Sequence, residues 1–133
     1  MALNISMYGQ TLEGSMSRQL CKVSEIGENG KEVVLRGDSG AIYVMLFKHE
    51  GQIRAFLNVC PHQGRPLNLA PDRFYFTPGG LLMCPHHGAS FQLSNGACVE
   101  GPCKGSALRS IETDVVEDVV WLMTDLAEPP PES

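Results

Sequence analysis

Apolar residues in this chain come in short runs that are separated by glycine, proline and charged residues. No segment shows a convincing helical stripe of apolar residues, and the length of the runs predicts β-strands. The expected strands are one marked by Leu20, Val23 and Ile26, then residues 31–36, 41–48, 53–59, 91–93, 97–99, 108–116 and 119–123.

Turn-forming residues separate these runs at three places. Glu50-Gly51 is expected to turn residues 41–48 into 53–59, Ser94-Asn95-Gly96 separates the next pair, and Glu117-Asp118 the last. Closely spaced short strands predict an all-β fold, an antiparallel sandwich or barrel. We expect one domain over residues 18–126, with a small lobe inserted at about 58–92, where Pro, Gly, His and Cys are dense. Residues 1–17 are expected to be a flexible leader and 127–133 a disordered tail.

Composition and charge narrow the function classes. The chain has 133 residues, of which 43% are hydrophobic, and a formal net charge of −5. Seven acidic residues and no Lys or Arg follow Arg109, which argues against nucleic acid and anionic membranes as partners. The sequence holds no apolar run near the roughly 18 residues needed to cross a bilayer and no secretory signal. We therefore expect a cytoplasmic protein.

Two cysteine- and histidine-containing segments carry the candidate chemistry. Five cysteines, an odd number, make a disulfide framework a poor explanation and metal binding a better one. Cys60-Pro61-His62-Gln63-Gly64 and Cys84-Pro85-His86-His87-Gly88 each place a thiol and an imidazole in one tight loop. Two Cys and two His fit a structural zinc ion or a [2Fe–2S] cluster, and ligand count does not decide between them. A β-domain without metal would leave these side chains together for no reason.

The pattern Cys-x-His, then Cys-x-x-His after 21 residues, resembles the Rieske family. Residues 60–67 and 84–91 resemble the two cluster loops of that family, and Glu100-Gly101-Pro102 resembles the Gly-Pro loop that covers the cluster. The resemblance spans residues 18–124 and implies the Rieske fold with one [2Fe–2S] cluster. By this resemblance, Cys60 and Cys84 bind the inner iron and His62 and His87 the outer iron. His86, next to His87, is then not a ligand.

Four kinds of Rieske protein are worth comparing. The respiratory type has an extra Cys in each loop, where this chain has Arg65 and His86, and two hydroxyl side chains, where it has Ala89 and Phe91. The missing hydroxyls imply a potential in the lower part of the Rieske range. A terminal oxygenase would need a second, catalytic domain, for which the chain is too short.

The resemblance therefore favours a ferredoxin that is not itself an enzyme. Such a protein passes single electrons from a flavin-dependent or other ferredoxin reductase to a terminal oxygenase of the ring-hydroxylating dioxygenase type, in aromatic hydrocarbon catabolism. We expect a monomer. The alternative is a small Rieske subunit of another redox enzyme, such as nitrite reductase.

Further residues carry subsidiary expectations. Gln63, Arg65, Pro66 and Pro85-His86 are expected to surround the outer iron and to form the docking face. Cys21 is expected to be a core residue and Cys103 to pack near the cluster, while a disulfide between Cys98 and Cys103 remains open. Trp121 is expected to anchor the core or a sheet face, and His49 to lie on the surface at a hairpin tip.

Overall fold

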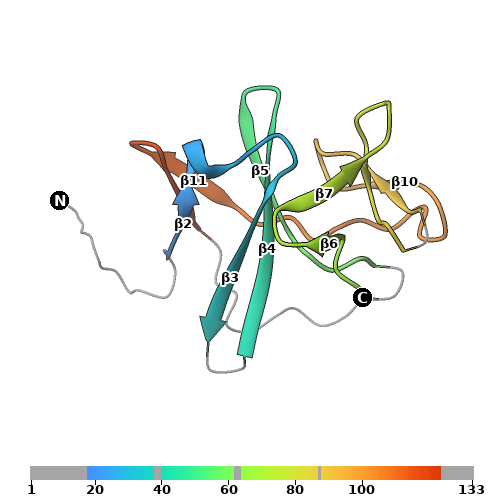
Figure 1. Ribbon diagram of the computed structural model, residues 1–133, viewed down its shortest axis with the longest axis horizontal. Coiled ribbons are helices and arrows are strands. Elements are labelled where there is room, and N and C mark those ends of the chain that lie inside the picture. Colours follow the sequence, from blue (N-terminus) through green and yellow to red (C-terminus); the bar gives the residue numbers. More distant parts are fainter. Residues whose placement is uncertain (1–17, 38–39, 62–63, 87, 124–133) are drawn as a thin grey trace.

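The computed structural model describes residues 18–37, 40–61, 64–86 and 88–123. These residues form three antiparallel β-sheets (Figure 1). Apart from one three-residue 3-10 helix, they contain no helix, and none of their elements is a helix long and apolar enough to span a bilayer. The predicted all-β class is confirmed.

The central sheet consists of β3 (Lys31–Gly37), β4 (Gly40–His49) and β5 (Gln52–Leu57), paired in that order. Glu50 and Gly51 form the tip of the β4–β5 hairpin, with φ of 52° and 78°. A two-residue turn with both residues in the left-handed region matches the twist of the flanking strands. The hairpin predicted at this position is therefore confirmed.

A second sheet, the base sheet, has the order β11 (Thr113–Val116), β12 (Val119–Leu122) and β2 (Arg18–Lys22). Glu117 and Asp118 connect its hairpin with φ of 52° and 69°, as predicted. Trp121 lies in β12 opposite Asp114 of β11 and is half-buried on a sheet face.

The first predicted strand is wrong beyond Lys22. Residues Val23–Glu25 form the 3-10 helix η2, and Ile26 caps it. The Lys22 backbone N–H donates to the Glu25 carboxylate at 2.9 Å, and the Val23 N–H donates to the Asp118 carbonyl at 2.8 Å. These two bonds satisfy backbone groups of Lys22 and Val23 that a longer strand would have paired. The chain therefore turns where the strand was expected to continue.

The third sheet, the lobe sheet, has the order β10 (Cys98–Glu100), β9 (Ser90–Phe91), β8 (Leu82–Met83), β7 (Arg73–Phe76) and β6 (Asn68–Ala70). Its strands are two to four residues long. In Figure 1 the central sheet stands between the base sheet on one side and this lobe on the other.

Strand β4 is shared by the two hydrophobic cores of the molecule. Val44 and Leu46 face the base core, whereas Met45 and Phe47 face the lobe core. Burial on both faces explains why this strand is a continuous apolar run rather than an alternating one. Phe47 also packs edge-on against Phe74 of β7, with ring centroids 5.1 Å apart, and so joins the lobe to the central sheet.

The chain returns from the lobe along β5. The Leu57 N–H donates to the Arg109 carbonyl at 3.0 Å, and the Ile111 N–H donates to the Ala55 carbonyl at 2.9 Å. The predicted strand at 108–116 is therefore wrong in its first half, since only Thr113–Val116 pair as a strand of the base sheet. The first half instead runs beside β5 and is held by isolated hydrogen bonds.

Candidate metal centre

The first candidate loop, between β5 and β6, is closed by two backbone hydrogen bonds. The Cys60 N–H donates to the Arg65 carbonyl at 2.8 Å, and the Gly64 N–H donates to the Cys60 carbonyl at 2.7 Å. Gly64 has a φ of 73°, in the left-handed region that favours glycine. The chain thus leaves Cys60 and returns to its backbone within five residues.

The second loop, between β8 and β9, repeats this arrangement. The Cys84 N–H donates to the Ala89 carbonyl at 2.7 Å, the Gly88 N–H donates to the Cys84 carbonyl at 3.0 Å, and Gly88 has a φ of 80°. Each cysteine is therefore the first residue of a loop closed by the same pair of bonds, with glycine four residues later. The two loops therefore place the Cys60 and Cys84 thiols in equivalent backbone settings, as expected for two ligands of one metal centre.

Both thiols point into the lobe core rather than into solvent. Cys60 and Cys84 are each 2% exposed and belong to one cluster of buried residues that includes Leu67 and Phe91. All five cysteines lie in the described part of the chain, and all are buried and outside any disulfide. The surroundings suit an inorganic group held by thiolates in a water-poor environment.

The histidine half of the predicted site lies outside the described residues. His62 and His87 belong there, as does Gln63, so their place in the site stays a prediction. Among the described residues, no group of three or more His, Cys, Asp or Glu gathers to hold a metal ion. Of the predicted docking residues, Arg65 and Pro66 are exposed, and Pro85 and His86 are half-buried.

The Gly-Pro loop covers the second cluster loop. A Cβ on Gly101 would lie 2.7 Å from Ala89 Cα and 3.0 Å from Ala89 N, and Gly101 has a φ of 98°. No residue with a side chain fits at this contact without a shift of backbone. The Glu100-Gly101-Pro102 segment therefore lies directly on the loop that follows Cys84, and its expected position over the cluster stays a prediction.

Two cysteines that the sequence left without a role meet beside the first loop. The Cys103 and Cys98 sulfurs are 2.9 Å apart, and Cys98 Sγ donates to the Glu100 carbonyl at 3.2 Å. Burial, together with the hydrogen-bonding neighbours Cys98 and Cys60, raises the pKa of the Cys103 thiol to about 12. The expectation that Cys103 packs near the site is met, and the two cysteines are free thiols.

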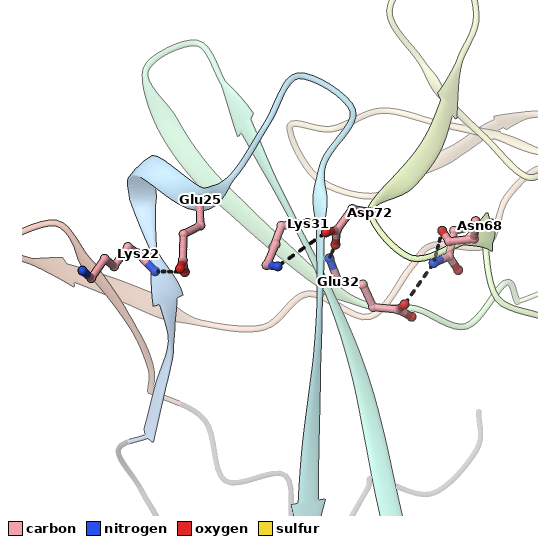
Figure 2. Close-up of polar contacts among 7 residues, drawn as sticks. Lys22, Glu25, Lys31, Glu32, Asn68 and Asp72 are labelled. Atoms are coloured by element: carbon pink, nitrogen blue, oxygen red, sulfur yellow. Dashed lines mark hydrogen bonds and ion pairs between the residues drawn. The ribbon is translucent and has the colours of Figure 1, made fainter.

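Sequence reasoning missed a buried polar network under the first loop. Asn58 is 3% exposed, and its Oδ1 accepts the Leu67 N–H at 2.7 Å. Its Nδ2 donates to Glu32 Oε2 at 3.0 Å and to Asn68 Oδ1 at 2.8 Å. Asn68 Nδ2 completes the network by donating to Glu32 Oε1 at 3.1 Å (Figure 2). The network thus ties both ends of residues 58–68 to β3.

An ion pair extends this network on the β3 side. Asp72, in the turn between β6 and β7, accepts the Glu32 N–H at 2.8 Å, and its other oxygen lies 3.4 Å from Lys31 Nζ (Figure 2).

The signal for the Asn58 network in the sequence was weak, because Asn is common in loops. Only its burial, which depends on the tertiary packing of β3 against the lobe, distinguishes Asn58 from a turn residue.

Asn58→Ala should lower the free energy of unfolding by about 3 kcal/mol, because it leaves buried partners in the network without hydrogen bonds. Urea denaturation monitored by circular dichroism measures this change. Asn95→Ala is the matched control, since Asn95 is exposed and its Oδ1 accepts the Ala97 N–H at 2.9 Å. A loss for Asn58→Ala no larger than that of Asn95→Ala would show that the network does not anchor the loop.

Comparison with known proteins identifies the family. Residues 17–117 match the Rieske [2Fe-2S] domain family. The chain is 37% identical over 70 residues to the oxygenase component of chloroacetanilide N-alkylformylase from Rhizorhabdus wittichii, covering 53% of this chain and 18% of that protein. It is 31% identical over 77 residues to the ferredoxin component of the alkene monooxygenase system of Xanthobacter autotrophicus, covering 58% of this chain and 57% of that protein. The match thus spans about a fifth of the length of the first relative and just over half of the length of the second.

Solved structures share the fold. The ferredoxin of carbazole 1,9a-dioxygenase from Nocardioides aromaticivorans superposes with a TM-score of 0.64 at 18% identity, over 82% of this chain and 98% of that one. A chain in the reduced complex between oxygenase and ferredoxin of carbazole 1,9a-dioxygenase gives a TM-score of 0.68 at 16% identity, over 88% of this chain and 30% of that one. At these identities the likeness concerns the fold.

The number of Cys and His ligands left open a zinc ion or a [2Fe–2S] cluster, and the family match decides for the cluster. A Rieske domain carries one [2Fe–2S] cluster, and two buried thiols in equivalent loops, under a glycine that admits no side chain, fit such a group. The match covers most of the chain and includes both loops and the covering segment. This chain therefore belongs to the Rieske [2Fe–2S] domain family.

Proposed function

We propose that this protein is a Rieske ferredoxin, a one-electron carrier between a reductase and a terminal oxygenase. The observation that carries the proposal is the extent of the structural match, which takes in 98% of a solved oxygenase-system ferredoxin. The ferredoxin component of an alkene monooxygenase is a sequence relative as well. A carrier of this kind needs no catalytic domain, and we expect it to act as a cytoplasmic monomer that diffuses between its two partners.

We propose Cys60, His62, Cys84 and His87 as the cluster ligands. The bound [2Fe–2S] cluster supplies one-electron oxidation and reduction. Both cysteines are 2% exposed, and the hydrogen bonds that close the paired loops fix the backbone around each thiol. A rigid site favours fast electron transfer, because little has to rearrange when the charge changes.

We propose that the partners dock beside the first loop. Arg65 and Pro66 are exposed there, and next to them Val59 is 47% and Leu69 64% exposed. Gly64, Pro66, Val59 and Leu69 belong to the lining of one shallow pocket. Exposed apolar side chains next to the Arg65 cation suit a small and short-lived contact.

The reduction potential should lie below about +200 mV, in the lower part of the range of −150 to +300 mV for Rieske centres. Hydroxyl donors to the cluster raise the potential, and Ala89 and Phe91 have none, while the Ser90 hydroxyl donates to the Gly88 carbonyl at 3.2 Å. Ala89→Ser should raise the potential measured by protein-film voltammetry, and Ala107→Ser, at an exposed alanine, should not. A wild-type potential above +200 mV would contradict this assignment.

Reconstitution with the reductase and terminal oxygenase encoded near its gene tests the function. The proposal expects substrate turnover that requires this protein, and slower reduction of the oxygenase by Arg65→Glu. Lys48→Glu, a charge reversal at an exposed residue near the β4–β5 tip, is the control and should behave as wild type. Turnover at full rate without this protein would reject the carrier role. Stable association with one large enzyme would favour a Rieske subunit instead.

A further inference from the structure

A third cysteine, Cys103, is held at the proposed cluster site by the loop that covers it. The Cys98 N–H donates to the Ser106 carbonyl at 2.9 Å, and the Ser106 N–H donates to the Cys103 carbonyl at 2.8 Å. On its other side, the Lys104 N–H donates to the Gly101 carbonyl at 3.2 Å. Cys103 is therefore fixed between β10 and the Gly-Pro segment, and it is 7% exposed.

The Cys103 thiol donates to Cys98 Sγ at 2.9 Å, and the Cys60 sulfur is its second hydrogen-bonding neighbour. Cys98 Sγ is itself placed to donate its hydrogen to the Glu100 carbonyl at 3.2 Å. A thiol has a single hydrogen, so Cys103 has one bond to give and two sulfurs to choose from. When Cys60 binds iron its sulfur is an anionic thiolate, and a charged acceptor forms the stronger bond.

We propose that Cys103 is a positioning residue for the cluster, whose thiol donates to the Cys60 sulfur and raises the reduction potential. This inference rests on the proposed function, because it takes Cys60 as a ligand. Reduction adds negative charge that the ligand sulfurs share, so a hydrogen bond to one of them stabilises the reduced state more than the oxidised state. The bond lies in a buried site, where water does not compete for the hydrogen.

The second loop supplies no comparable hydroxyl or thiol donor among its described residues. Ala89 and Phe91 have no hydroxyl, and the Ser90 hydroxyl donates to the Gly88 carbonyl. The Cys103 thiol lies on the covering loop, beside the first loop. It thus donates the hydrogen bond that raises the reduction potential, in place of a hydroxyl of the second loop. The effect should be moderate, since S–H is a weaker donor than O–H.

Voltammetry of three variants tests the proposal. Cys103→Ala should make the equilibrium constant for reduction about tenfold smaller, which is about 59 mV for one electron. Cys103→Ser keeps a donor and should stay nearer to wild type than Cys103→Ala. Cys21→Ala is the matched control, since Cys21 is likewise a buried free thiol but lies in the base core, and its potential should equal that of wild type.

Iron and acid-labile sulfide are measured on every sample. A Cys103→Ala protein with full iron and sulfide and an unchanged potential would overturn the role of Cys103 while leaving the cluster assignment intact. Wild-type protein without iron or sulfide would instead overturn the proposed function. A Cys98–Cys103 disulfide in the isolated holoprotein, found by mass spectrometry, would also overturn the inference, because it removes the donor.

A second measurement covers the case in which Cys103→Ala does not hold a cluster. Infrared difference spectra of reduced against oxidised wild type should contain a shifted S–H stretching band that is absent from Cys103→Ser. The shift is expected because the bond to Cys60 strengthens as the sulfur gains charge. An S–H band that does not respond to reduction would contradict the proposal.

Discussion

Cys84→Ala should give a folded, colourless protein with neither iron nor acid-labile sulfide. Cys84 is one of two buried thiols in the paired loops, and an alanine cannot bind iron. The apolar core tolerates the smaller side chain, since a buried cysteine packs as a small hydrophobe. Iron and sulfide analysis, visible absorption and circular dichroism measure the cluster and the fold separately. We expect loss of essentially all cluster, and the same result for Cys60→Ala.

Cys21→Ala and Cys98→Ala are the controls for this experiment. Cys21 is buried in the base core, and burial followed by the nearby Glu25 carboxylate raises the pKa of its thiol. Neither Cys21 nor Cys98 belongs to the proposed ligand set, so both variants should keep two irons and two sulfides per chain. A Cys84→Ala protein with its full iron content would mean that the second loop does not bind the cluster through this residue.

Gly101→Ala should be strongly destabilising, although it adds a single methyl group. Its Cβ would lie 2.7 Å from Ala89 Cα and force the covering segment away from the second loop. The left-handed φ of 98° adds strain for any side chain. We expect a loss of about 3 kcal/mol in the free energy of unfolding, the sum of overpacking and backbone strain, together with faster loss of the cluster in air. Denaturation and the decay of visible absorption measure the two effects.

Gly105→Ala separates the steric contact from the backbone strain. Gly105 lies in the same loop with a φ of 99°, and a Cβ there would meet nothing within 4 Å. The two variants therefore share the conformational cost and differ in the contact with Ala89. Equal losses of stability in both would show that the covering segment does not press on the second cluster loop.

Local signals in the sequence predicted much of the fold. The Glu50-Gly51 and Glu117-Asp118 turns are specified by adjacent residues, and their hairpins form at the expected places. The apolar run expected as a strand over residues 41–48 became β4, and the two cores on either side of it explain why the run is continuous. Such features depend on residues close in the chain, so a single sequence suffices to find them.

Features that depend on tertiary contacts could not be predicted. Val23 and Ile26 were expected to continue the first strand, and the bonds from Lys22 N–H to Glu25 and from Val23 N–H to Asp118 decided otherwise. The Asn58 network depends on Glu32, 26 residues away. The same holds for the site, where the repeated Cys and His spacing pointed to the two loops, whereas the meeting of Cys103 with Cys60 results from how the covering loop folds back.

The central claim is that this chain binds one [2Fe–2S] cluster with sulfur ligands on one iron and imidazole ligands on the other. Electron paramagnetic resonance of the dithionite-reduced protein, grown with ¹⁵N-labelled histidine, tests it most directly. The account predicts two irons and two sulfides per chain and a one-electron signal that is coupled to ¹⁵N of two histidines, with one of the two couplings lost in His62→Cys and the other in His87→Cys. Zinc without labile sulfide, or an iron–sulfur signal without coupling to histidine nitrogen, would contradict it.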